Sequence, residues 1–207
     1  MRIVPYHRIF LVLTFGLLIF PLSVVNAQET PTEAVTGTIE RLQKTLEDTG
    51  LTSEKRSEIV NGIVFERFDL ERLTDLILKP YKGKDKEENL EAFRTLYREY
   101  MKVVQLGRVE KLRGTKIAVI DEVRSGEGQA TITAKIYFKD GDDMTVSFFL
   151  NYIGGTWRVF DIDFGITTFA QFEYASFGKR TLPKKGMLGM FEEMREKMRE
   201  LKQQRVK

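Results

Sequence analysis

The residues able to do chemistry are few in this chain of 207 residues. It contains no cysteine, and its one histidine is His7, inside an N-terminal stretch over residues 1–27. If that stretch is removed, the chain has no Ser-His-Asp or Cys-His catalytic group and no zinc site built from imidazole or thiolate. We expect no metal or organic cofactor. Carboxylates, lysines, tyrosines and hydroxyls remain, which lowers the expectation of an enzyme.

The carboxylates near residue 160 are the main candidates for acid–base catalysis. Asp161 and Asp163 alternate with Phe160 and Ile162 in a strand-like segment, so either could point into a pocket as a general base. Further candidates are Asp121 and Tyr137. Cone-shaped α+β folds host small enzymes with an Asp base, which keeps an enzyme as one alternative. For each residue, the competing interpretation is a surface or structurally hydrogen-bonded group.

The N-terminus has the pattern of a secretory signal peptide. A basic leader with Arg2 and Arg8 precedes an apolar run over residues 9–20, and small residues end at Ala27. This pattern predicts residues 1–27 as a signal that is cleaved after Ala27, and export to the periplasm. An uncleaved anchor helix is the alternative, but the run is shorter than the ~20 residues that span a bilayer, and Pro21 breaks it.

The charge of the remaining chain gives no sign of a nucleic-acid partner. Without Arg2 and Arg8, 31 of the 33 basic residues remain and nearly balance the 30 acidic ones. The two signs alternate along the chain, as on a solvated surface. We therefore predict one domain over residues 28–182, a C-terminal helix over 183–207, no nucleic-acid binding, and a monomer.

Apolar residues recur at helical spacing over the first half of the chain. This periodicity predicts helices over 33–47, from 52 onward, from the N-cap Asp69 to residue 79, and over 86–106. Asp85-x-x-Glu88 has the form of a capping box for the last and longest helix, and Gly107 is expected to end it. The aromatic stripe of that helix is expected to face the sheet described next.

After Gly107 the spacing of apolar residues changes from the helical repeat of about 3.6 residues to the strand repeat of 2 residues. Segments 116–123, 129–138, 144–152 and 156–164 alternate like strands, and short glycine-containing turns join them. They predict a four-stranded antiparallel meander. Thr168 and Gln171 then have the spacing of another capping box. The fold class is therefore α+β: N-terminal helices on a curved meander, followed by C-terminal helices.

Aromatic residues exceed what a core of this size requires. Large rings on a helix and on a facing sheet can hold the two apart, which predicts an apolar cavity between them. A sealed core with a surface interaction role is the alternative. The predicted lining comprises Phe68, Leu73, Leu76, Phe93, Leu96, Tyr97, Tyr100, Val104, Ala134, Ile136, Phe138, Val146, Phe148, Leu150, Trp157, Val159, Phe169 and Phe172.

One run of residues resembles a known family. Trp157-Arg-Val-Phe-Asp-Ile162, followed by "FGITTFAQFEYASF", is similar to the corresponding stretch of the MlaC (toluene tolerance) family, and the order of elements over residues 33–182 agrees. The resemblance implies a periplasmic phospholipid shuttle that maintains outer-membrane lipid asymmetry. It also implies two docking partners: an inner-membrane lipid ABC transporter complex and an outer-membrane lipoprotein–porin complex.

The segment after Pro183 has a methionine-rich stripe. Met187, Met190, Met194 and Met198 recur every three or four residues among charged ones, which predicts an amphipathic helix. Three roles are open for it: a helix docked on the domain, a lid over the cavity, or a partner-binding helix. Because Pro183 separates it from the rest, we predict that the fold survives its removal.

Overall fold

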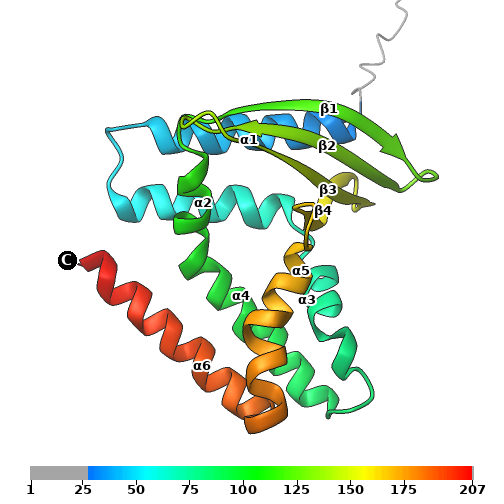
Figure 1. The fold of residues 1–207 in the computed structure, drawn as a ribbon, viewed down its shortest axis with the longest axis vertical. Helices are drawn as coiled ribbons and strands as arrows, with labels where there is room; N and C mark the ends of the chain where they lie inside the picture. The colour runs from blue at the N-terminus through cyan, green and yellow to red at the C-terminus, as the bar shows by residue number, and fades with distance from the viewer. Residues whose placement is uncertain (1–27, 207) are drawn as a thin grey trace, which may run out of the picture.

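The computed structural model describes residues 28–206. A four-stranded sheet lies at one end of the molecule, with α1 against it and α2 beneath α1 (Figure 1). The helices α3, α5 and α6 gather at the opposite end, and α4 runs between the two ends. The α+β architecture predicted from the sequence is confirmed, with helices before and after the sheet in the chain.

The elements follow the predicted order with shifts of a few residues at their ends. Their bounds are α1 Pro31–Glu47, α2 Ser53–Arg67, α3 Leu70–Leu78, η1 Lys79–Tyr81, α4 Glu87–Val109, η2 Glu110–Leu112, β1 Lys116–Arg124, β2 Gln129–Tyr137, β3 Asp143–Ile153, β4 Thr156–Asp163, α5 Phe169–Glu173, the π-helical η3 Tyr174–Lys179, and α6 Arg180–Val206.

The start of α4 and its end both differ from the prediction. Asp85 does not form a capping box: Lys86 is the N-cap, and no side chain caps the helix there. The Asp85 carboxylate instead accepts hydrogen bonds from the Lys86 N–H and the Asn89 side chain. Gly107 stays within the helix, which runs to Val109, because packing of Leu106 and Val109 outweighs the cost of one glycine.

The strands form an antiparallel meander in the order β1-β2-β3-β4. The register places Ala134 opposite Val146 and Ile136 opposite Met144, so one apolar face of β2 and β3 is continuous. Gly154 and Gly155 make the β3–β4 turn with φ angles of 60° and 85°, which glycine adopts without strain. Register shifts in β1 and between β3 and β4 accompany the curvature of the sheet (Figure 1).

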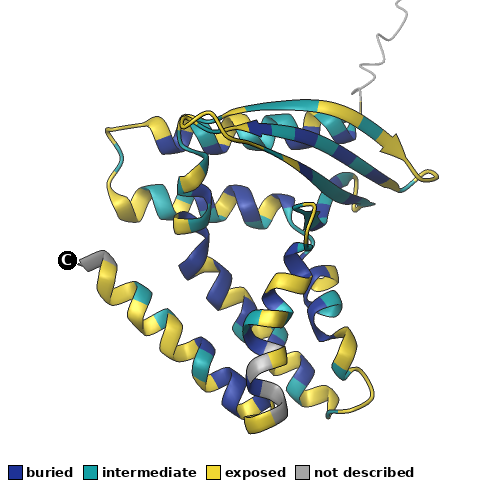
Figure 2. Cartoon of the chain, in the orientation of Figure 1, coloured by how far each residue is buried: buried dark blue, intermediate teal, exposed yellow. Residues whose placement is uncertain are grey.

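A closed cluster of aromatic, methionine and aliphatic side chains holds α3, α4, α5 and α6 together at the end opposite the sheet. Phe93 and Tyr97 of α4 are fully buried within it and stack with ring centroids 5.5 Å apart. Their neighbours come from α3, α5, η3 and α6, so the expectation that Phe93 and Tyr97 face the sheet is wrong. Figure 2 shows buried residues along the inner sides of these helices. The sheet and α1 share a separate cluster around Ile132, Leu150 and Trp157.

The C-terminal helix is part of this closed cluster over its first half. Met187, Met190, Phe191 and Met194 are buried against α4, which assigns this part of α6 as core. The backbone break lies at Gly186, whose φ of 63° and ψ of −171° are not helical, rather than at Pro183. This burial argues against the expectation that the fold survives removal of the whole segment. Beyond residue 196, Met198 and Leu201 are partly buried and pack against the cluster.

Candidate functional site

A large cavity lies between the sheet and the helices. Its volume is about 1150 Å³, above the range of roughly 300–1,000 Å³ that is typical of ligand pockets. The concave face of the sheet makes one wall, and α1, α2 and the C-terminal part of α4 make others. Residues of α5, η3 and the distal half of α6 complete the boundary. This volume contradicts the alternative of a sealed core.

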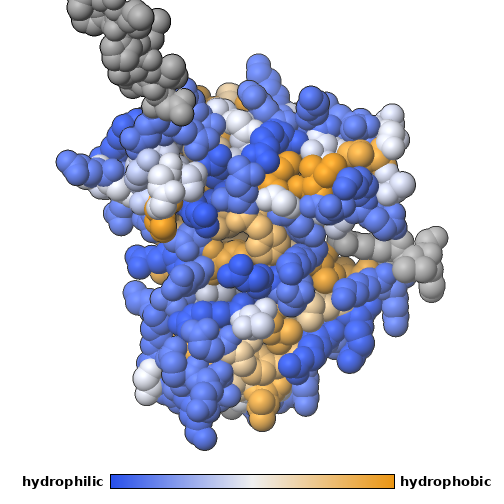
Figure 3. Space-filling model, turned by 180° about the vertical axis from the view of Figure 1, so that it is seen from behind, coloured by the Kyte–Doolittle hydropathy of each residue, from blue (hydrophilic) through white to orange (hydrophobic). Residues whose placement is uncertain are grey.

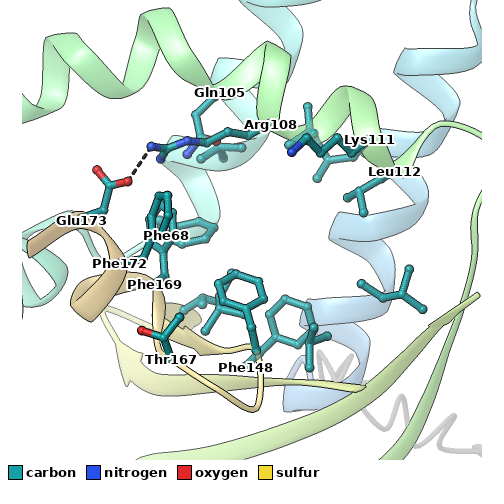
Figure 4. Close-up of a pocket in the computed structure, with 18 of the residues that line it drawn as sticks. Phe68, Gln105, Arg108, Lys111, Leu112, Phe148, Thr167, Phe169, Phe172 and Glu173 are labelled. Atoms are coloured by element: carbon teal, nitrogen blue, oxygen red, sulfur yellow. Dashed lines mark hydrogen bonds and ion pairs between the residues drawn. The ribbon is translucent and has the colours of Figure 1, made fainter. Parts of the chain in front are cut away.

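The sheet wall is apolar because alternate residues of β2 and β3 point toward the cavity. β2 and β3 provide Ile136, Met144, Val146 and Phe148, and β4 provides Val159 and Ile162. Beside this wall, α1 packs against the sheet and contributes Val35, Ile39 and Leu42. Figure 4 shows Phe148 and Thr167 on the side facing Arg108, Lys111 and Leu112, with open space between them.

Half of the predicted lining residues border this cavity. They are Phe68, Tyr100, Ile136, Phe138, Val146, Phe148, Val159, Phe169 and Phe172. The others lie outside its boundary. The closed cluster includes or contacts Leu73, Leu76, Phe93, Leu96, Tyr97 and Val104. The cluster shared by the sheet and α1 contains Leu150 and Trp157, and Ala134 packs beside Ile136 and Val146. The α4 residues are covered by α6 rather than by the sheet, and the α3 residues pack toward α4 and α5.

A buried ion pair stands on the cavity wall. Glu173 is fully buried at the end of α5, and one of its oxygens accepts a hydrogen bond of 2.5 Å from the Arg108 guanidinium. Its other oxygen accepts one of 3.0 Å from the Tyr97 hydroxyl. The Arg108 guanidinium also lies 5.0 Å from the centre of the Phe169 ring, a cation–π contact. The pair therefore fixes α5 against α4 at the junction of cavity and closed cluster (Figure 4).

Burial changes the acidity of this group of residues. It raises the pKa of Glu173 above its usual value, although the Arg108 guanidinium opposes the change. Burial, together with the nearby Glu173 carboxylate, raises the pKa of Tyr100 to about 12, and burial raises the pKa of Tyr97 well above 10. Both Glu173 oxygens already accept hydrogen bonds, so we assign this carboxylate a structural role.

Sequence reasoning missed Arg108, Glu173 and the contribution of α1. One signal was available for Glu173, since it is the only charged residue between Phe164 and Lys179. A lone carboxylate in an apolar aromatic run is expected to be buried and paired. No such signal marks Arg108, which follows the apolar stripe of a helix that also carries many exposed charges.

The mouth of the cavity has an exposed apolar lip, formed by Ile166 and Phe172. Ile166 is 96% exposed and Phe172 is 52% exposed, yet both border the cavity. Ile166 stands at the tip of a turn closed by a hydrogen bond of 3.1 Å from the Phe164 N–H to the Thr167 carbonyl. The turn thus holds a large apolar side chain in solvent beside the opening. Seen from behind, apolar side chains also reach the surface between the sheet end and the helical end of the molecule (Figure 3).

The carboxylates proposed for catalysis lie elsewhere. Asp161 is buried, but its oxygen accepts hydrogen bonds of 2.9 Å from the backbone N–H groups of Ile162 and Ala170, which ties β4 to the start of α5. Asp163 accepts one from the Gly165 N–H. Neither borders the cavity, nor do Asp121 and Tyr137. Within residues 28–206, we find no group of three His, Cys, Asp or Glu side chains placed to hold a metal ion.

Comparison with protein-family models identifies the chain. The model of the MlaC protein family matches residues 32–196, which includes every strand and helix from α2 through η3. The chain belongs to the MlaC family. The resemblance seen in the sequence is therefore confirmed. None of the curated proteins matches the chain significantly.

A solved structure has the same fold as this MlaC family member. It is the phospholipid-binding protein from Ralstonia solanacearum, determined in complex with a phospholipid. The TM-score is 0.66 at 14% identity, and the match covers 81% of this chain and 96% of the other. At this identity the likeness establishes the fold. In the part of the chain that the structure describes, no helix is both long and apolar enough to cross a membrane.

Proposed function

We propose that this protein is a periplasmic carrier that holds the acyl chains of a phospholipid in its cavity and moves the lipid between the inner and outer membranes. The observation that carries the proposal is the apolar cavity of about 1150 Å³ in a member of the MlaC family. The Ralstonia protein with the same fold binds a phospholipid, which supports a lipid as the occupant here.

The energetics of acyl-chain burial favour transfer through docking. Each buried methylene contributes ~0.8 kcal/mol, so two chains of about sixteen carbons gain roughly 20 kcal/mol before costs. This approaches the practical limit of non-covalent affinity, and escape into water would be very slow. The carrier therefore has to meet another apolar site at its mouth. We propose the partners that the family implies: an inner-membrane lipid ABC transporter complex and an outer-membrane lipoprotein–porin complex.

Such a carrier breaks no covalent bond, so we propose that it acts without catalysis or a cofactor, as a monomer. Its role is then to maintain the lipid asymmetry of the outer membrane. The export signal on which the periplasmic location depends, residues 1–27, lies outside the described residues.

Mass spectrometry of the exported protein tests the proposal. The protein is purified without detergent, and its native mass and organic extract are analysed. We expect phospholipid in about one-to-one ratio, and transfer of a labelled phospholipid between vesicles. A protein that is entirely free of lipid and transfers none would contradict the carrier function.

A further inference from the structure

We propose that the mouth of the cavity selects a zwitterionic phospholipid, with the phosphate beside Lys111 and the amine beside the acidic side of α6. This rests on the proposed function and names the headgroup class. The cavity boundary includes equal numbers of charges of each sign: Arg67, Arg108, Lys111 and Lys197, and Glu173, Glu193, Glu196 and Glu200.

The charges on the inner wall are already paired. Arg108 is bound by Glu173, and Arg67 forms a bidentate pair with Glu29 at 2.9 Å. Both pairs connect elements of the fold, Arg67 also through a hydrogen bond to the Trp157 carbonyl. Because these pairs are largely buried, they have little capacity for a further ligand, and the headgroup has to be recognised by the exposed charges around the cavity.

Lys111 is the cation available on the α4 side. It lies in η2, next to Leu112, is exposed, and borders the cavity. In Figure 4 it projects from the same wall as Arg108. Within the described part of the chain, no carboxylate is found in an ion pair with Lys111. An ammonium group of this kind is a suitable partner for a lipid phosphate.

The part of the cavity boundary that α6 forms has an excess of negative charge. Glu196 and Glu200 are one helical turn apart and both border the cavity, with Lys197 between them. Their ion-pair partners, Arg199 and Lys197, are exposed and lie on the same helix. Pairs of this type are weak, so an amine on a bound lipid can compete for the two carboxylates. Glu193 is different, since the Thr181 hydroxyl and Lys185 already hold it.

The two sides together distinguish headgroup classes. The phosphate is common to all glycerophospholipids, so Lys111 contributes to loading without selecting among them. An amine-bearing headgroup adds a positive charge that Glu196 and Glu200 attract. A headgroup without the amine leaves a net negative lipid beside them, which is repulsive. Selection is therefore assigned to α6, whose last residues lie beyond the segment that matches the family model.

The test loads the exported full-length protein from vesicles containing equimolar phosphatidylethanolamine and phosphatidylglycerol with identical acyl chains. Mass spectrometry of the bound lipid gives the ratio of the two headgroups. We expect the wild type to be enriched in phosphatidylethanolamine, and the double variant E196Q/E200Q to lower the bound ratio by about fivefold. Rising salt should reduce the wild-type preference, because the two carboxylates are exposed.

Two variants serve as controls. E192Q removes an exposed carboxylate from the same helix that does not border the cavity, and should leave the ratio unchanged. K111Q should lower the loading of both lipids without changing their ratio. A wild-type ratio equal to that of the vesicles, a preference for phosphatidylglycerol, or an equal effect of E192Q would overturn the headgroup inference while leaving the carrier function intact. Absence of any bound lipid would overturn both.

Discussion

The two ends of α4 lie in different surroundings. Near its N-terminus, Phe93 and Tyr97 contact α3, η3 and α6, and side chains fill the space around them. Near its C-terminus, Arg108 and Val109 border the cavity. The difference comes from the opposing elements: α3, η3 and α6 surround the first end, whereas the second end packs against α1 and α2 and also borders the open space under the sheet. Whether an apolar stripe borders a filled core or a cavity therefore depends on the element that lies opposite it.

The largest loss of stability is expected from truncation within α6. Deleting residues 187–207 removes four side chains that are at most 4% exposed, those of Met187, Met190, Phe191 and Met194. Burial of each contributes about 2 kcal/mol, so the loss approaches the whole stability of a domain of this size. We expect the truncated protein to lack a cooperative unfolding transition in urea. Deleting only residues 202–207 should change the free energy of unfolding by less than about 1 kcal/mol.

A cooperative transition close to that of the full-length protein after the longer deletion would show that the closed cluster does not need α6. In that case the methionine stripe would be free to act as a lid or a docking helix, as the sequence allowed.

Removing one phenylalanine from each region sharpens the comparison. Phe93→Ala empties a filled site in the closed cluster, and we expect it to cost about 3–5 kcal/mol. Phe148→Ala enlarges a cavity that already exists, so its cost should be less than half as large. The measurement is urea unfolding of both variants after lipid is removed, since bound lipid would itself add stability. Equal costs would mean that the cavity closes in the lipid-free protein.

The sequence predicted the elements better than their surroundings. Helical and strand periodicity, the Thr168–Gln171 capping box and the glycine turns depend on residues close in the chain, and the structure confirms them. The inward face of β2 and β3 also followed from alternation alone. The division of apolar residues between closed cluster and cavity did not, because it depends on the position of α6 against α4. Val104 and Val146 have the same side chain, yet only Val146 borders the cavity.

These two valines provide a matched substitution. Val146→Phe adds volume where open space is available, so we expect stability to change by less than about 1 kcal/mol and lipid loading to fall. Val104→Phe adds the same volume to the closed cluster, where overpacking typically costs 1–3 kcal/mol. Urea unfolding and mass spectrometry of bound lipid check the pair. If both variants lost stability equally and loaded lipid normally, the cavity would not be the binding site.

Alkaline pH should destabilise the fold through Tyr100, which lies where the closed cluster meets the cavity. Burial raises the pKa of Tyr100 to about 12, whereas tyrosine in the unfolded chain ionises near 10. The folded state thus keeps a proton that the unfolded state loses, and stability falls as the pH rises above 10. We expect a loss of about 1 kcal/mol at pH 11 from Tyr100 alone. Tyr100→Phe should reduce the slope of stability against pH, and an unchanged slope would contradict the assignment.

The smallest effect on stability, and a specific one on transfer, is expected at Ile166. Its side chain is 96% exposed, so Ile166→Ser should leave the free energy of unfolding within about 0.5 kcal/mol of the wild type. An exposed apolar residue beside the opening can shield acyl chains from water as they pass from the cavity to another apolar site. We therefore expect slower transfer of labelled phospholipid between vesicles, with normal loading at equilibrium. The control is Leu188→Ser, which changes a 69% exposed leucine that does not border the cavity. If both variants slow transfer equally, general surface hydrophobicity is responsible, and if neither does, lipid leaves by a route that avoids the lip formed by Ile166 and Phe172.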